Sequence, residues 1–166
     1  MSGVRKFTLG EIGPVRMCKR IMKDETSPDG EIPFFKIGTF GGEADVFISR
    51  ERYEEYKSKY PYPKRGDVLI SAAGTIGRLV VFDGGESYFQ DCNIVWVEND
   101  ETKVTNECLY YALQLARWKP SQGSTILRLY NDDIRAVEFF APESLSDQRH
   151  VASILSTIDR KIALNR

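Results

Sequence analysis

The segment KRGDVLISAAGTIGRLVVF, residues 64–82, places a short polar stretch between two apolar runs. Runs of this length and β-branched content predict a β-hairpin. Its tip would carry side chains and backbone suited to binding an anion: Gly74, Thr75, Gly77 and Arg78. Glycine leaves backbone N–H groups open to a phosphate, a threonine hydroxyl can donate to one, and arginine can pair with a phosphate or a guanine edge. Alternatively, both glycines serve only a tight turn or a bulge.

A second group of polar side chains follows Pro120, which ends a predicted helix. The sequence QGST supplies Gln122, Ser124 and Thr125 within four residues, and Arg128 follows in a predicted strand. Such a loop is suited to contacts with phosphates or base edges, although a polar surface loop is an equally good interpretation.

Cations are concentrated in one region of a chain whose net charge is −1. Between Arg50 and Arg65 there are six cations and three anions, a local excess of six minus three. Lys57 and Lys59 in this region are candidates for phosphate contacts, and so are Lys36 and Thr39 at the end of an earlier predicted strand. A solvated helix face explains the same charges equally well.

Residues able to do covalent or metal chemistry are sparse. The one histidine, His150, lies at the start of the predicted terminal helix, where an exposed helical residue is a simpler interpretation than a catalytic one oriented beside a nucleophile. The three cysteines match neither a zinc spacing nor a disulfide framework. A metal-dependent nuclease would have to assemble Asp29, Glu101 and Lys103 from separate segments. We therefore expect no metal site, and a polypeptide that catalyses nothing by itself.

The length of 166 residues and an apolar fraction of 42% predict one domain with a real core. No apolar run suits a membrane span, no signal peptide precedes the domain, and the unpaired cysteines indicate a reducing cytoplasm. The predicted strands lie within residues 31–40, 42–49, 64–82, 92–98, 126–130 and 136–140, with a turn at NDD between the last two. Helices are predicted after Ser49, which would cap the first, and near 106–117.

The last segment has a different pattern. Val151, Leu155, Ile158 and Ile162 are spaced by four, three and four residues, which is a short heptad seam. A helix of this length is marginal alone, so its apolar seam needs a partner. That partner is the rest of the domain, a second copy or another subunit. A protein–protein adaptor that uses this seam is therefore a further alternative.

Several segments, in order, resemble a target-recognition domain of a type I restriction-modification specificity subunit. TLGEIG resembles the opening Leu-Gly-Glu of that family, GEIPFFKIGTF its Gly-x-Ile-Pro-aromatic segment, and KRGDVLISAAGTIGR its Gly-Asp signature. LYYALQ is similar to its Leu-Tyr-Tyr-x-Leu helix, and the run from QGST to SDQRHVASILSTIDRKI is similar to its closing loop, strand, turn and helix.

The resemblance implies an α+β fold: a mixed, twisted β-sheet with short helices and a C-terminal helix that begins a coiled-coil spacer. Residues 1–145 would form the recognition domain, and residues 146–166 the start of the spacer or dimerisation helix. The implied function is sequence-specific binding of double-stranded DNA, directing methyltransferase and restriction subunits to a bipartite site. A second recognition domain, or a second copy joined through the helix, would read the other half. S-adenosylmethionine, ATP and Mg²⁺ are expected on partner subunits, with no cofactor on this chain.

Overall fold

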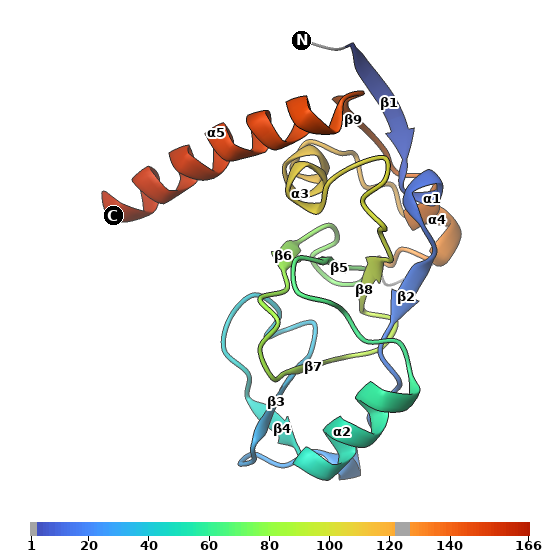
Figure 1. Ribbon diagram of the computed structural model, residues 1–166. Coiled ribbons are helices and arrows are strands. Elements are labelled where there is room, and N and C mark those ends of the chain that lie inside the picture. The colour runs from blue at the N-terminus through green and yellow to red at the C-terminus, as the bar shows by residue number, and fades with distance from the viewer. Residues whose placement is uncertain (1–2, 122–126) are drawn as a thin grey trace.

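The computed structural model describes residues 3–121 and 127–166. Figure 1 shows an elongated body with α2 at one end and β1, β9 and α5 at the other. The strands are β1 (Val4–Thr8), β2 (Val15–Met17), β3 (Ile32–Phe35), β4 (Val46–Ile48), β5 (Val68–Ser71), β6 (Leu79–Val81), β7 (Tyr88–Phe89), β8 (Ile94–Val97) and β9 (Glu138–Pro142). The helices are α1 (Leu9–Ile12), α2 (Arg50–Lys59), α3 (Asn106–Gln114), α4 (Asn131–Arg135) and α5 (Leu145–Leu164), with a 3-10 turn η1 at Lys23–Glu25.

Within the described residues the strands form three small sheets rather than one. The central sheet is antiparallel in the order β2-β8-β5-β6, and β1 pairs with β9 in a separate antiparallel ribbon. The third sheet is mixed, because β3 runs antiparallel to β4 and parallel to β7. The predicted α+β class, a mixed twisted sheet with short helices and a C-terminal helix, is confirmed, with the strands divided among separate sheets.

The central sheet separates two cores. Successive side chains of a strand point to opposite faces, so each inner strand contributes to both. Ile70 of β5 and Val95 of β8 pack into a largely aliphatic core beneath α3. Leu69 and Trp96 pack on the other side, in a core rich in phenylalanine and tyrosine that lies toward α2. The continuous apolar runs VLIS and IVWV are therefore explained by burial on both faces.

Most of the predicted elements are confirmed. The 64–82 segment is an antiparallel hairpin of β5 and β6, and the Ser49 hydroxyl caps α2 by accepting from the Arg52 N–H at 3.2 Å. The helix predicted near 106–117 is α3, which ends at Gln114. Thr105 caps this helix with its side chain, as Ser49 caps α2.

The prediction around NDD was wrong. Asn131–Asp133 begins the short helix α4, because the Asp133 carboxylate accepts the Tyr130 N–H at 2.8 Å and so caps the first turn. The strand predicted at 126–130 is also absent from its described part, residues 127–130. Only Arg128 pairs there, in an isolated bridge with Ala73.

The helix α5 is fixed at its root and extends past α3 (Figure 1). Gln148 is fully buried and bonds three backbone groups: its amide oxygen accepts from Thr105 N–H at 2.8 Å, and its amide nitrogen donates to the carbonyls of Lys103 and Pro142. No helix in residues 3–121 and 127–166 is long and apolar enough to cross a bilayer.

Candidate nucleic-acid interface

The hairpin tip is a left-handed turn closed by a buried serine. Gly74 and Gly77 have φ angles of 65° and 78°, so the turn does require glycine at both positions. The Ser71 hydroxyl accepts from the Arg78 N–H at 2.8 Å and donates to the Thr75 carbonyl. The Thr75 side chain is left exposed at the end of this rigid turn.

Gly77 also allows a close approach, and the group that approaches is within the protein. A Cβ at Gly77 would lie 2.4 Å from Cδ1 of Trp118, so the indole packs directly on the bare backbone. Trp118 follows α3 and is half-buried against the aliphatic core. The alternative reading of this glycine, a purely structural one, is therefore supported by its contacts. Gly74 has more space, with Ile37 Cγ1 at 3.5 Å from an added Cβ.

Arg78 connects the tip to the loop between β3 and β4. Its Nη1 donates to the carbonyl of Phe40 at 2.9 Å. In the same loop the Thr39 hydroxyl accepts the Lys36 N–H at 3.1 Å, so this side chain also shapes its own turn. The Lys36 ammonium pairs with Asp45 at 3.1 Å. The loop therefore contacts the tip at two residues that flank Thr39 in sequence: the Phe40 carbonyl, bonded by Arg78, and the Ile37 side chain, which lies next to Gly74.

Arg128 belongs to a segment that is distant from the hairpin in sequence but lies beside its tip. The Leu129 N–H donates to the Ala72 carbonyl at 2.7 Å, next to the bridge between Arg128 and Ala73. The Arg128 guanidinium donates to the side chains of Asn93 and, at 3.3 Å, Cys92. The candidates Gln122, Ser124 and Thr125 lie outside the described residues.

These contacts assemble one surface from three separate segments. We name it the tip cluster and define it as Thr39, Gly74, Thr75, Arg78 and Arg128. The two arginines are held by neutral acceptors: a carbonyl, an amide oxygen and a thiol. Their charges are thus not cancelled by a bonded carboxylate within the described residues, which leaves them available to an anionic ligand.

The Gly-Asp pair of the hairpin signature lies at the open end, away from the tip. Gly66 has a φ angle of 93°, and its N–H donates to the Phe82 carbonyl at 2.8 Å. The Asp67 carboxylate accepts the Lys64 N–H at 2.7 Å, while burial raises the pKa of this carboxyl. These residues close the hairpin, so their role in the motif is structural.

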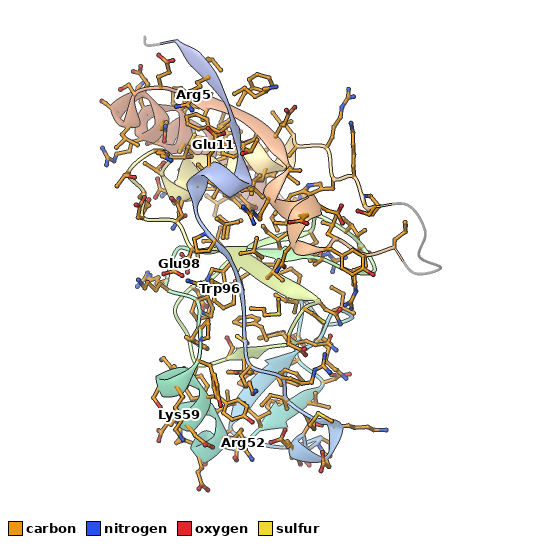
Figure 2. The ribbon with its side chains drawn as sticks, turned by 90° about the vertical axis from the view of Figure 1, so that its right-hand side faces the viewer. Arg5, Glu11, Arg52, Lys59, Trp96 and Glu98 are labelled. Carbon is orange, nitrogen blue, oxygen red and sulfur yellow. The ribbon has the colours of Figure 1, made fainter. Side chains whose placement is uncertain are left out.

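Lys57 and Lys59 lie on α2, at the end of the molecule where Figure 2 labels Arg52 and Lys59. The Lys59 ammonium pairs with Glu55 at 3.0 Å, and this partner raises the lysine pKa. The Lys57 ammonium donates to the Tyr53 hydroxyl at 3.1 Å and lies over the rings of Tyr53 and Tyr62. The structure therefore does not bring the two lysines together with the tip cluster.

The residues of the nuclease alternative have separate structural roles. The Glu101 carboxylate accepts the Asn106 N–H at the start of α3, and the Lys103 ammonium donates to the Glu11 carbonyl. Asp29 is exposed in the loop that follows Ser27. In the part of the chain that the structure describes, no group of three or more His, Cys, Asp or Glu side chains is arranged to hold a metal. Neither the nuclease nor the adaptor alternative gains support.

The predicted seam divides along α5. Val151 and Leu155 are half-buried beside the α3 side of the domain, where the Tyr111 hydroxyl donates to Asp159 at 2.8 Å. Ile158 and Ile162 are 47% and 49% exposed. The first two therefore serve the domain's own packing as well, and the last two present an apolar stripe to solvent.

Sequence reasoning missed three residues that organise this region: Asn93, Trp118 and Gln148. None belongs to a motif with a chemical signature, and each acts through contacts with segments distant in sequence. A tryptophan between Arg117 and Lys119 was the one signal available in the sequence, and it does not indicate which segment Trp118 would contact.

Comparisons with known proteins agree with the geometry. The model of the type I restriction modification DNA specificity domain matches residues 1–166. A protein described as a type I restriction enzyme specificity subunit, from Haemophilus influenzae, is 56% identical over 151 residues, 91% of this chain and 39% of that protein.

Two solved structures share the fold. The S subunit of a type I restriction-modification system from M. genitalium has a TM-score of 0.69 at 18% identity, over 98% of this chain and 40% of that one. The HsdS subunit from Thermoanaerobacter tengcongensis has a TM-score of 0.64 at 20% identity, over 98% and 39% respectively. This chain thus spans about two fifths of the length of these relatives. With the family model matching from the first residue to the last, the chain belongs to the type I restriction-modification DNA specificity domains.

Proposed function

We propose that this domain binds double-stranded DNA in a sequence-specific manner, as the specificity component, or half of it, of a type I restriction-modification complex. It directs methyltransferase and restriction subunits to a bipartite site. The chain itself recognises the DNA sequence and positions the complex on it. The methyltransferase and restriction reactions are carried out by those partner subunits, which bind S-adenosylmethionine, ATP and Mg²⁺. The complex acts in the cytoplasm, where DNA is accessible.

One observation carries the proposal: in a member of this family, Arg78 of the hairpin tip and Arg128, which pairs with Ala73 beside that tip, are bonded by neutral acceptors, and no described carboxylate is bonded to either. Contacts to phosphate fix the register of a protein on DNA, whereas arginine forms two hydrogen bonds to guanine in the major groove. Arg78 and Arg128 each use a minority of their five N–H donors in bonds to the described residues. The remainder can reach such a base edge.

A bipartite site requires two reading surfaces. We propose that residues 1–145 form one of them and that residues 146–166 begin the helix that joins it to the second. The exposed side chains of Ile158 and Ile162 are suited to that contact. If the second surface belongs to another copy of this chain, two-fold symmetry of the protein would be matched by a palindromic, interrupted site.

Selection and sequencing of random duplex DNA tests this function directly, with the chain alone and together with a methyltransferase subunit of a type I system. We expect an enriched interrupted palindrome for a symmetric pair, or a single half-site for one domain. The Lys64 to Phe82 hairpin is probed in the same assay with Thr75→Ala, whose exposed side chain forms no described hydrogen bond. Absence of any enriched sequence under both conditions, at low salt, would refute the proposed function.

A further inference from the structure

The turn between β7 and β8, residues Gln90–Asn93, contacts three other segments through its side chains. The Gln90 amide oxygen accepts the Ile37 N–H at 3.0 Å, in the β3–β4 loop. The Asp91 carboxylate accepts from Arg20 Nε at 2.8 Å. Cys92 and Asn93 both accept from the Arg128 guanidinium. We name residues 90–93 the hub turn.

The hub turn is also bonded to the hairpin tip itself. The Asn93 carbonyl accepts the Ala72 N–H at 2.8 Å, one residue from the bridge between Ala73 and Arg128. Cys92 has a φ angle of 40°, in the left-handed region, which turns the chain so that consecutive side chains reach different neighbours. The turn therefore connects every segment of the tip cluster: the β3–β4 loop, the tip and the strand-like segment of Arg128.

The contact with Arg128 is the one that bears on reading DNA. An arginine side chain has many rotamers, and ordering it at the moment of binding costs conformational entropy. Donation to both Asn93 and Cys92 fixes the guanidinium plane before DNA arrives. Two of its five donors are used in this way, and the other three keep a set orientation.

We propose that Asn93 is a positioning residue for base reading: through Arg128 it determines which base is preferred at one position of the target. The inference rests on the proposed function and adds to it a residue that touches no DNA. Its neighbour Asp91 differs, because it holds Arg20 with a carboxylate in an ion pair that anchors the turn. Through Asn93, the hub turn is a specificity-determining segment of the domain.

A double-mutant cycle separates positioning from a general structural role. Asn93→Ala removes an acceptor but leaves the backbone bond to Ala72 intact. We expect about tenfold weaker binding to the selected site and a broader base preference at one position, with non-specific affinity unchanged. Because Asn93 acts through Arg128, Arg128→Ala should have a similar effect, and adding Asn93→Ala to it should change nothing further.

Matched variants keep the result interpretable. Asn93→Asp retains an acceptor oxygen and should keep the wild-type base preference, although its carboxylate offsets the Arg128 charge and should lower affinity. Gln114→Ala removes an exposed amide side chain at the end of α3 and should bind normally. Melting temperature is measured for each. Losses that add in the double variant, or an unchanged preference in Asn93→Ala, would overturn the inference while leaving the proposed function standing. If the wild-type chain enriches no sequence, the function itself fails, and the inference with it.

The Cys92 thiol offers a second measurement that does not depend on a variant folding. Cys92 is half-buried and contacts Arg128, whereas Cys18 is 2% exposed and burial raises its pKa to about 12. Cys108 is buried as well, with a raised pKa. A maleimide should therefore modify Cys92 first, and the adduct should displace Arg128 and broaden the same base preference. An adduct that leaves the preference unchanged would contradict the inference.

Discussion

The tip cluster and the surface of α2 both carry cations, but the groups that bond these cations differ. They are mainly carboxylates on α2 and neutral acceptors at the tip. On α2, Arg50 bonds Glu31 and Glu86 and lies 4.0 Å from Glu54, and Arg52 bonds Glu25 and Glu55. The carboxylates of Glu86 and Glu31 raise the pKa of Arg50. At the tip, Arg78 and Arg128 are bonded by a carbonyl, an amide and a thiol, which orient a guanidinium without cancelling its charge.

The comparison teaches that a local excess of cations in a sequence does not identify an anion-binding surface. The excess of three between Arg50 and Arg65 is largely offset by carboxylates from Glu25, Glu31 and Glu86, which lie outside that window. What distinguishes a binding surface is the chemistry of the group that holds each cation.

The largest expected effect is on stability. It distinguishes the tip, where a side chain packs on a glycine backbone, from α2, where ion pairs lie at the surface. Gly77→Ala forces a left-handed φ on alanine and a contact of 2.4 Å with Trp118. We expect a loss of about 2–4 kcal/mol in the free energy of unfolding. Arg52→Ala on α2 removes partly exposed ion pairs with Glu25 and Glu55 and should cost about 1 kcal/mol or less. Urea denaturation measures both.

Gly74→Ala is the matched control, because its φ of 65° is equally left-handed while the nearest atom to its Cβ is 3.5 Å away. It should cost about 1 kcal/mol. Equal losses of stability at Gly74 and Gly77 would show that the Trp118 side chain moves aside at little cost and that its indole does not stabilise the tip.

The next effect is on DNA binding by the tip. Arg78→Ala should weaken the selected site about tenfold and lower the preference for one base. Because its Nη1 also holds the Phe40 carbonyl, Arg78→Lys serves as the companion variant. Lysine keeps the charge but not the planar fork, so it should restore non-specific affinity without restoring the base preference. Titration of fluorescent duplexes, specific and scrambled, distinguishes these outcomes, and an unaffected Arg78→Ala would remove this residue from the interface.

The smallest effect is expected on α2. Replacing Lys57 and Lys59 together by alanine should weaken DNA binding by less than about threefold, because both ammonium groups already have partners in the protein. If both contacted phosphates, the slope of log affinity against log salt would fall by about 1.8. A slope change of that size, measured between low and physiological salt, would show that Lys57 and Lys59 contact phosphates and that the surface of α2 is part of the DNA interface.

The sequence predicted the local structure well where local physics decides it. The cap at Ser49, the apolar runs of β5 and β8 and the turn glycines of the tip are all encoded within a few residues. It failed at Leu127–Tyr130, where a strand pattern finds only one pairing partner, and at Asn131–Asp133, where a side-chain cap favours helix over turn.

The candidate site was predictable in part for the same reason. Thr75 and Arg78 follow from the hairpin alone. That Arg128 would join them depends on its pairing with Ala73 and its bonds to the hub turn, which are contacts between distant segments. The packing of Trp118 on Gly77 is likewise invisible in composition or periodicity.

The buried amide of Gln148 makes α5 a stiff lever. Its three bonds tie the root of the helix to the loop before α3 and to the end of β9, so the helix cannot swivel without breaking them. A helix of 20 residues is about 30 Å long, so a tilt of about 10° at the root moves its far end by about 5 Å. A small change in the bonds of Gln148 would thus produce a larger change in the distance between this domain and the partner bound to the far end of α5.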